Sequence, residues 1–251
     1  MRYNGGKPRG TEETSTMNEL SAYLEPTWFV DSNAPSIVAL AREVGGGVTD
    51  EVEQACRLFY AVRDGVRYTA YNLDMRPEAL RATHVLETGG GWCVSKSVLL
   101  AAVCRAAGIP CRLGYANVRN HMATQKLLDF LGTDIFYYHG YNELYLRGKW
   151  VKATTAFNRT LCDKARIAPL DFDGVHDSIY HPFDLAGHRY MEYLHEYGSF
   201  ADVPYDALIT TFREVYPRIS SSEGNGAALS GDFEAEIEAE SNASPREMNR
   251  Q

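Results

Sequence analysis

The sequence predicts an α+β fold in which helices pack on a short antiparallel sheet and further helices form a C-terminal cap. Three observations lead to this prediction. Apolar residues recur at helical spacing in segments between residues 35 and 107, two-residue alternation follows between residues 111 and 155, and helical patterns return after Pro169. Within the strand region, Arg147 and Gly148 form a hairpin turn, which joins neighbouring strands in antiparallel pairing.

Length and composition predict one folded domain with two unstructured ends. A chain of 251 residues, 45% of them hydrophobic, can bury one substantial core. Residues 1–18 hold almost no apolar side chains, and residues 220–251 begin with a Ser/Gly-rich stretch and then turn acidic. We therefore expect a folded domain over residues 19–219, a disordered N-terminal segment, and a disordered acidic tail in which Phe233 to Glu240 form only a transient helix.

Two scaffold helices are predicted at the start of the domain. Pro35 to Glu43 carries apolar residues on one side, and a triple glycine ends it. Thr49 is placed to cap the next helix, which continues to Val62. Glu51 and Glu53 lie in its first turn, where the positive end of the helix dipole stabilises carboxylates.

The clearest helix runs from Cys93 to Ala107. Its apolar residues form one face, and Gly108 and Pro110 end it. The glycines at 89–91 delay its start to Trp92 or Cys93, so Cys93 lies among unpaired backbone N–H groups at the positive end of the helix dipole. This position is expected to lower the pKa of the thiol. It also supplies oxyanion donors from the backbone N–H of Trp92 or Cys93.

Strands and further helices are predicted for the rest of the chain. Strands are expected at residues 111–118, 136–146 and 149–155, with a polar, helix-compatible segment at 119–132. Helices are expected at residues 188–197 and 205–215.

Charge and histidine spacing argue against several classes of function. Five of the eight net negative charges lie after residue 220, so the body of the chain is close to neutral and has no basic stripe for nucleic acid. His121, His176, His181 and His188 lack the spacing of metal ligands, and we expect neither a metal nor a cofactor.

Cysteine content and hydropathy indicate the compartment. The five cysteines are odd in number and include no C-x-x-C pair, so we expect reduced thiols. No apolar stretch approaches the roughly 18 residues of a membrane-spanning helix, and the first twenty residues lack the apolar core of a secretory signal. We expect a cytoplasmic protein without a membrane partner. The sequence does not indicate the oligomeric state.

Cys93 and His139 have the properties of a nucleophile and its base. A nucleophilic cysteine needs a base, donors for the oxyanion, and a group that orients the base. Cys93 opens a helix and His139 lies on a separate predicted strand, and a sheet packed on the helix terminus can bring them together. The alternative is that Cys93 is a small buried side chain, as we expect of Cys104, and that His139 is structural.

The residues around this pair resemble the transglutaminase-like superfamily. The resemblance rests on four stretches and covers about residues 79–158. These are Gly91-Trp92-Cys93, Arg105-Ala106-Ala107-Gly108-Ile109-Pro110-Cys111-Arg112, His139-Gly140-Tyr141-Asn142-Glu143 and Lys149-Trp150-Val151. The resemblance implies a papain-like core, in which a cysteine opens a central helix and a histidine and an aspartate lie on adjacent strands of the following antiparallel sheet.

One position departs from the superfamily pattern. Four residues after the strand tryptophan, where members carry the aspartate, this chain has Thr154. A threonine hydroxyl can accept the imidazole N–H but brings no negative charge. Thr154 is therefore expected to orient a His139 that is a weaker base. Asp163 and Glu143 are alternatives for the missing charge.

The resemblance implies acyl transfer through Cys93. We expect the thiolate to attack an amide or thioester carbonyl of a small-molecule or peptide substrate, with Tyr115, Asn142 and Tyr180 among the substrate-binding residues. Water as the acceptor makes the chain a hydrolase, and an amine makes it an amide-forming acyltransferase. The missing aspartate supports a third alternative, a degenerate domain that binds without catalysis.

Overall fold

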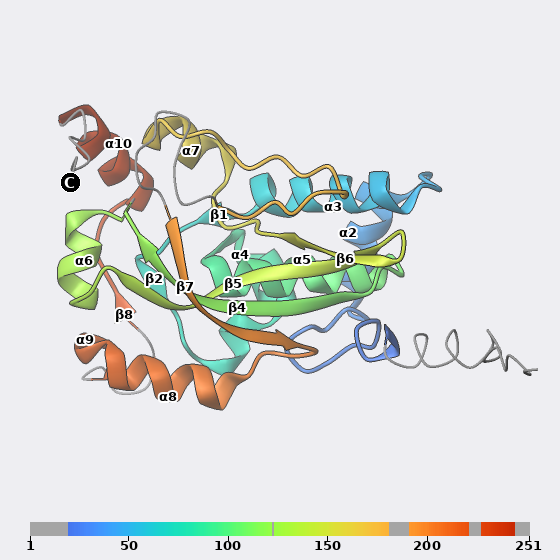
Figure 1. The fold of residues 1–251 in the computed structure, drawn as a ribbon, viewed down its shortest axis with the longest axis horizontal. Helices are drawn as coiled ribbons and strands as arrows, with labels where there is room; N and C mark the ends of the chain where they lie inside the picture. The colour runs from blue at the N-terminus through green and yellow to red at the C-terminus, as the bar shows by residue number, and fades with distance from the viewer. Residues whose placement is uncertain (1–19, 122, 181–190, 221–226, 244–251) are drawn as a thin grey trace, which may run out of the picture.

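The computed structural model describes residues 20–121, 123–180, 191–220 and 227–243. A four-stranded antiparallel sheet packs one face on a central helix, and further helices surround this pair (Figure 1). The predicted α+β fold, with helices on an antiparallel sheet, is confirmed.

The strands of the sheet follow the order β6-β5-β4-β7. They are β4 (Cys111–Asn120), β5 (Ile135–Leu146), β6 (Lys149–Ala153) and β7 (Met191–Phe200). The predicted turn between β5 and β6 forms at Arg147 and Gly148, whose φ angles are 49° and 83°. Positive φ at both turn residues matches the right-handed twist of the two strands.

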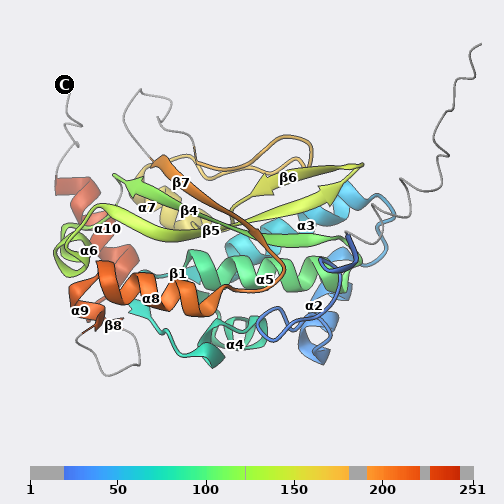
Figure 2. The same ribbon diagram turned by 60° about the horizontal axis from the view of Figure 1, so that its bottom comes forward.

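Four helices lie on one side of the sheet. They are α2 (Pro35–Gly45), α3 (Glu51–Gly65), α4 (Ala82–Thr88) and α5 (Cys93–Ala106). Figure 2 shows the sheet on one side of α5 and α4 on the other. The cap of α3 is Asp50 rather than the predicted Thr49, because the Asp50 carboxylate accepts the Glu53 N–H at 2.9 Å.

Helix α5 is buried on all sides. Every residue from Cys93 to Arg105 is buried, so the buried surface of α5 extends beyond the single apolar face predicted from its sequence. Lys96 donates to the carbonyls of Arg63 (2.9 Å) and Val66 (2.5 Å) at the end of α3. Arg105 donates to three backbone carbonyls. These hydrogen bonds satisfy two charged groups that the core would otherwise leave unpaired.

Short elements connect and flank these layers. They are β1 (Arg67–Tyr68), β2 (Asn72–Leu73), a 3-10 turn (Pro77–Leu80), β3 (Gly90–Gly91), α6 (Gln125–Leu131), α7 (Arg159–Ala165), α8 (Tyr205–Val215), α9 (Pro217–Ser220), β8 (Ala227–Ala228) and α10 (Phe233–Ala243). Within the described ranges, no helix has the length and hydropathy to cross a membrane. The cytoplasmic location stays a prediction.

The predicted helix over residues 188–197 is wrong from residue 191 onward, and residues 188–190 lie outside the described part of the chain. Residues 191–200 form β7, which pairs with β4 from Asn120↔Met191 to Leu113↔Phe200. Without β7, β4 would be an edge strand with unpaired backbone groups. Strand pairing therefore overrides the local helical pattern, and it adds a fourth strand to the sheet.

The predicted disorder of residues 220–251 does not hold for residues 227–243. Helix α10 buries Phe233 and Ile237, and the Phe233 ring lies 5.7 Å from the Tyr68 ring and 5.1 Å from the Tyr71 ring. Strand β8 pairs with β2, and α10 lies beside α7 (Figure 1). Two apolar residues cannot hold an isolated helix of this length together, so its order depends on the surface that receives it.

Candidate active site

Helix α5 begins directly after a glycine turn that a short strand pair holds in place. The N–H groups of Arg67 and Thr69 donate to the carbonyls of Gly89 and Gly91, each at 2.9 Å, in the parallel pairing of β1 with β3. A Cβ at Gly91 would lie 2.6 Å from the Ser95 hydroxyl, so only glycine leaves room for that side chain. The turn therefore fixes where α5 starts and where Cys93 lies.

The Ser95 hydroxyl binds one predicted oxyanion donor. It accepts the Trp92 backbone N–H at 2.9 Å and donates to the Trp92 carbonyl at 3.2 Å. The helix cap uses the Trp92 N–H in this arrangement, so its role as an oxyanion donor stays a prediction and would require this hydrogen bond to break. The sequence signal was the serine three residues after Trp92, a spacing typical of a capping interaction.

Strand β5 approaches the start of α5 at Gly140. A Cβ at this position would lie 3.0 Å from the Cys93 carbonyl oxygen and from Val94 Cα. The close approach brings the Gly140 backbone N–H near the Cys93 sulfur, where it acts with the N–H groups of Val94 and Cys93 to lower the pKa of the thiol. Gly140 was missed as a site residue, although a glycine directly after the candidate base is the signal of a close backbone approach.

Burial nevertheless raises the pKa of the Cys93 thiol to about 11, against its ordinary 9.0. The side chain is 7% exposed, and the loss of water outweighs the three N–H donors. The predicted lowering of the thiol pKa by the helix terminus is therefore wrong for the resting site. At neutral pH the sulfur keeps its proton.

His139 follows an irregularity in β5. The β4–β5 register pairs Ala116 with His139 and Val118 with Phe136, so β5 carries one extra residue here. Within the extra length, Tyr138 has a φ of 53°, in the left-handed region. Such a bulge changes the face to which the following side chains point, and bulges occur often beside active sites.

The His139 ring lies between two tyrosines. Its centroid is 6.5 Å from those of Tyr180 and Tyr193, with both pairs edge to face. Burial lowers the pKa of His139 to about 4. Its Nε2 is buried without a hydrogen-bond partner among the described residues. The imidazole is therefore neutral in the resting site, and ring packing restricts its orientation.

The orienting role of Thr154 stays a prediction. Its hydroxyl accepts the Ala156 N–H at 3.4 Å, and across the described ranges no hydrogen bond joins it to His139. The alternative carboxylates do not supply the charge either. Glu143 is paired with Arg112, and Asp163 is exposed on α7.

The three predicted substrate-binding residues have different surroundings. Tyr115 is fully buried, and the charge of Cys93 is among the causes that raise its pKa, after burial itself. Tyr180 accepts the Phe157 N–H at 3.3 Å and packs beside His139. Asn142 does not lie at an open site, because it is fully buried and its amide donates to the Ser97 carbonyl at 2.9 Å. Asn142 connects β5 to α5, and its assignment to substrate stays a prediction.

Tyrosines from several elements lie near the thiol, and sequence reasoning missed Tyr68 and Tyr216 among them. Burial is the main cause of a raised pKa in Tyr68, Tyr193 and Tyr216, and the charge of Cys93 contributes in each. Tyr68 lies on β1, Tyr193 on β7, and Tyr216 directly after α8. No local sequence signal identifies them, because only the tertiary structure brings these elements to the start of α5.

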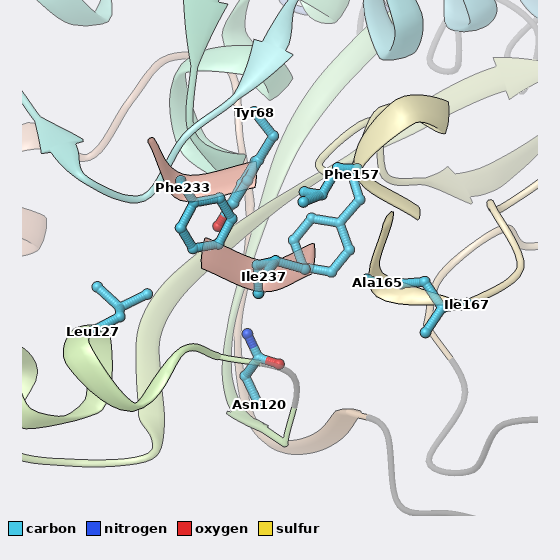
Figure 3. Close-up of a pocket in the computed structure, with 9 residues that line it drawn as sticks. Tyr68, Asn120, Leu127, Phe157, Ala165, Ile167, Phe233 and Ile237 are labelled. Atoms are coloured by element: carbon cyan, nitrogen blue, oxygen red, sulfur yellow. The ribbon is translucent and has the colours of Figure 1, made fainter. Parts of the chain in front are cut away.

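An apolar pocket lies behind one of these tyrosines. Tyr68, Phe157, Phe233 and Ile237 gather around it (Figure 3). Tyr68 borders both the pocket and the surroundings of Cys93, since the charge of Cys93 is a cause of its raised pKa. Helix α10 therefore covers a surface that lies one side chain away from the thiol.

The remaining candidates for metal or disulfide chemistry give no site. In the part of the chain described, no cluster of three or more His, Cys, Asp or Glu side chains could hold a metal ion. All five cysteines are free.

The chain is similar to a known protein family and to solved structures. The model of the transglutaminase-like superfamily matches residues 38–155. No curated protein sequence matches the chain. Among solved structures, the chain is similar to a "Putative Cysteine Protease" from Cytophaga hutchinsonii, with 17% identity, a TM-score of 0.47, and coverage of 75% of this chain and 49% of that one.

A second similar structure is the periplasmic domain of TgpA from Pseudomonas aeruginosa. It has 18% identity, a TM-score of 0.40, and coverage of 55% of this chain and 47% of that one. This chain thus spans about half the length of each of these two structures. The matched family segment carries Cys93, His139 and Thr154, and it contains all four stretches on which the sequence resemblance rests. Residues 38–155 of this chain belong to the transglutaminase-like superfamily.

Proposed function

We propose that this chain is a cysteine-dependent acyl-transfer enzyme that hydrolyses an amide or thioester through an acyl-Cys93 intermediate, with His139 as the base. The superfamily match supports a cysteine-type enzyme in general. The observation that supports the proposal best is the close approach of β5 to the start of α5, where a Cβ at Gly140, the residue next to His139, would lie 3.0 Å from the Cys93 carbonyl oxygen. The backbone N–H groups there also act to lower the pKa of the thiol, which a structural cysteine in a core does not need.

The reaction has two halves. The thiol proton passes to His139 while sulfur attacks the carbonyl carbon, and the carbonyl electron pair moves onto oxygen. The intermediate then collapses, the bond to the leaving group breaks, and His139 returns the proton to the departing amine or thiol. Water, deprotonated by His139, releases the acid and frees Cys93. An amine in place of water gives an amide, which is the alternative outcome.

The resting protonation states fit a mechanism in which substrate activates the pair. With thiol and imidazole both neutral, the proton moves only as sulfur attacks. Catalytic hydrogen bonds are often absent in a free enzyme and form in the substrate complex. A thiol needs less help from a base than a serine hydroxyl does, so a weakly basic His139 without an aspartate partner is sufficient for thioesters and activated esters.

One observation favours a second candidate, a binding module without catalysis. Burial keeps both members of the pair neutral, and no carboxylate supports His139 in the described ranges. In that case Cys93 should behave as Cys104 does, since Cys104 is buried on the same helix and has no proposed role in the chemistry.

The two candidates are separated by acylation with 4-nitrophenyl acetate, followed by peptide mass spectrometry at all five cysteines. The enzyme proposal predicts that Cys93 alone is acetylated fast in the wild type. Cys93→Ala should take up no acetyl group at this position, and the rate of acetylation of Cys93 should be about 100-fold lower in His139→Ala. Because the resting thiol has a pKa of about 11, the rate should rise with pH across the neutral range. Adding an amine and identifying the product distinguishes the transferase from the hydrolase. Acetylation of Cys93 no faster than of Cys104 would favour the binding module.

A further inference from the structure

Acyl transfer at Cys93 needs hydrogen-bond donors for the oxyanion, and one of the expected backbone donors is already bound. The oxyanion of a tetrahedral intermediate is stabilised by donors fixed before the reaction. The Trp92 N–H is bound to the Ser95 hydroxyl at 2.9 Å. The N–H groups of Cys93, Val94 and Gly140 act to lower the pKa of the thiol. These groups favour the thiolate, and a side-chain donor is needed to replace the Trp92 N–H at the oxyanion.

Two buried tyrosine hydroxyls near the thiol have no use in the fold. The hydroxyls of Tyr115 and Tyr193 are buried without a hydrogen-bond partner among the described residues. Tyr216, which also lies near Cys93, is different. Its hydroxyl accepts the Tyr137 N–H at 2.8 Å and donates to the Ile135 carbonyl at 3.2 Å. Buried polar groups are nearly always paired, so an unpaired hydroxyl at a reactive centre indicates a missing ligand atom.

The surroundings of Tyr193 suit a substrate better than those of Tyr115. The Tyr193 ring stands edge to face with the His139 ring, at 6.5 Å between centroids and 80° between planes. The residue Tyr193 is partly exposed although its hydroxyl is buried, whereas Tyr115 is fully enclosed. Tyr193 pairs with Val118 on β4, and Ala116 on the same strand pairs with His139.

The Tyr193 hydroxyl is also in the protonation state that a donor requires. Burial raises its pKa, so the phenol keeps its proton at neutral pH. The Tyr180 N–H approaches the Tyr193 oxygen without reaching hydrogen-bond geometry and lowers the pKa slightly. That approach uses the oxygen as an acceptor and leaves the O–H free to donate.

We propose that the Tyr193 hydroxyl donates a hydrogen bond to the oxyanion formed on Cys93, in place of the Trp92 N–H. The inference rests on the proposed acyl-transfer function. When sulfur bonds to the carbonyl carbon and the carbonyl electron pair moves to oxygen, the phenol O–H shortens its contact with that oxygen and keeps its proton. As the leaving group departs and the C=O bond reforms, the hydrogen bond weakens again.

Two reactions of the same thiol test this role. Acetylation by 4-nitrophenyl acetate passes through an oxyanion, whereas alkylation by iodoacetamide displaces iodide from carbon and forms none. In Tyr193→Phe, the ratio of acetylation rate to alkylation rate at Cys93 should fall about 100-fold, with alkylation itself unchanged. A residue that only supported the fold would change both rates together.

Matched variants make the result specific. Tyr197→Phe, on the same strand, removes a hydroxyl from a ring that stacks on Tyr138 at 4.1 Å and should leave the ratio within about two-fold of the wild type. An unchanged ratio in Tyr193→Phe, or a fall in Tyr115→Phe instead, would overturn the assignment. Fast alkylation of Cys104 in Tyr193→Phe would show that this variant unfolds. Tyr193→His, which keeps a ring and a donor, would then replace it and should retain part of the ratio of acetylation rate to alkylation rate at Cys93. If wild-type Cys93 takes no acetyl group at all, the acyl-transfer function is wrong and the inference fails with it.

Discussion

Three backbone N–H groups act to lower the pKa of the Cys93 thiol, yet burial raises it to about 11. The same balance holds for His139 and Lys96, whose pKa values burial lowers to about 4 and about 7. In each case the cost of removing a charge from water exceeds the gain from nearby dipoles. Burial therefore keeps Cys93 and His139 neutral near pH 7, whereas Lys96 is only partly protonated there.

Lys96 gives a test of this balance in the stability of the protein. The unfolded chain binds the Lys96 proton up to about pH 10.5, and the folded chain binds it only up to about pH 7. Between these values the unfolded state holds more protons, so Lys96 makes the free energy of unfolding rise with pH. Below about pH 7 both states are protonated and the slope from this residue vanishes.

In Lys96→Met, that rise in the free energy of unfolding should be lost. Urea unfolding of the wild type and the variant near pH 7 and near pH 10 measures the difference between their slopes. Lys149→Met is the matched control, because Lys149 is exposed on β6 and should leave the slope unchanged. Equal slopes in Lys96→Met and the wild type would mean that Lys96 keeps an ordinary pKa in the folded protein.

At the scale of elements, the site depends on how β5 meets the start of α5. The extra residue at Tyr138 shifts the register of β5 directly before His139, and Gly140 then allows backbone contact with Cys93 and Val94. Strand β7 adds Tyr193 from the other side of β4. One helix terminus therefore receives groups from two strands that lie about fifty residues apart in sequence.

Gly140→Ala should disrupt this contact. The new Cβ would lie 3.0 Å from the Cys93 carbonyl oxygen and from Val94 Cα, and backbone atoms cannot move as easily as a side chain. We expect the free energy of unfolding to fall by about 1–3 kcal/mol. Acetylation of Cys93 should fall further than stability explains, because β5 moves away from the thiol.

Gly65→Ala is the control for this substitution, since a Cβ there meets nothing within 4 Å. It should leave both stability and acetylation close to the wild type. Denaturant unfolding and 4-nitrophenolate release measure the two effects. Full activity in Gly140→Ala would show that β5 and α5 have more space between them than the structure has.

At the scale of the whole molecule, the acidic C-terminal region covers a basic surface next to the site. Asp232 pairs with Arg67, Glu234 with Lys164, and Glu236 with Lys126. Phe233 and Ile237 also line the apolar pocket beside Tyr68 (Figure 3). Most of these ion pairs are partly exposed and contribute little each, so the apolar contacts should provide most of the stabilisation.

Phe233→Ala should therefore lower the free energy of unfolding by about 3–5 kcal/mol, the range for a buried phenylalanine. Leu194→Ala, which changes a side chain that is 45% exposed on β7, should stay within about 0.5 kcal/mol of the wild type. Urea unfolding of the full chain measures both variants. If Phe233→Ala unfolded like the wild type, α10 would not be packed on the domain in solution.

Local patterns were sufficient for the elements whose own residues determine their structure. Helices α2, α3, α5 and α8 and the hairpin of β5 and β6 follow from periodicity, glycine stops and turn residues, and each matches its predicted segment within a few residues. The helical prediction failed at β7 because a strand partner decided its structure. The disorder prediction failed at α10 because a receiving surface ordered it.

The sequence by itself determined the candidate nucleophile and base, the helix that presents Cys93, and the departure at Thr154, because these depend on residue types at short spacings. Only the tertiary structure decided which donors are free, which groups are buried, and which strands reach the thiol. Hydrogen-bond occupancy and desolvation depend on residues distant in sequence. The Ser95 cap, the Gly140 contact and the Tyr193 hydroxyl could therefore be placed only when α5, β5 and β7 were seen together.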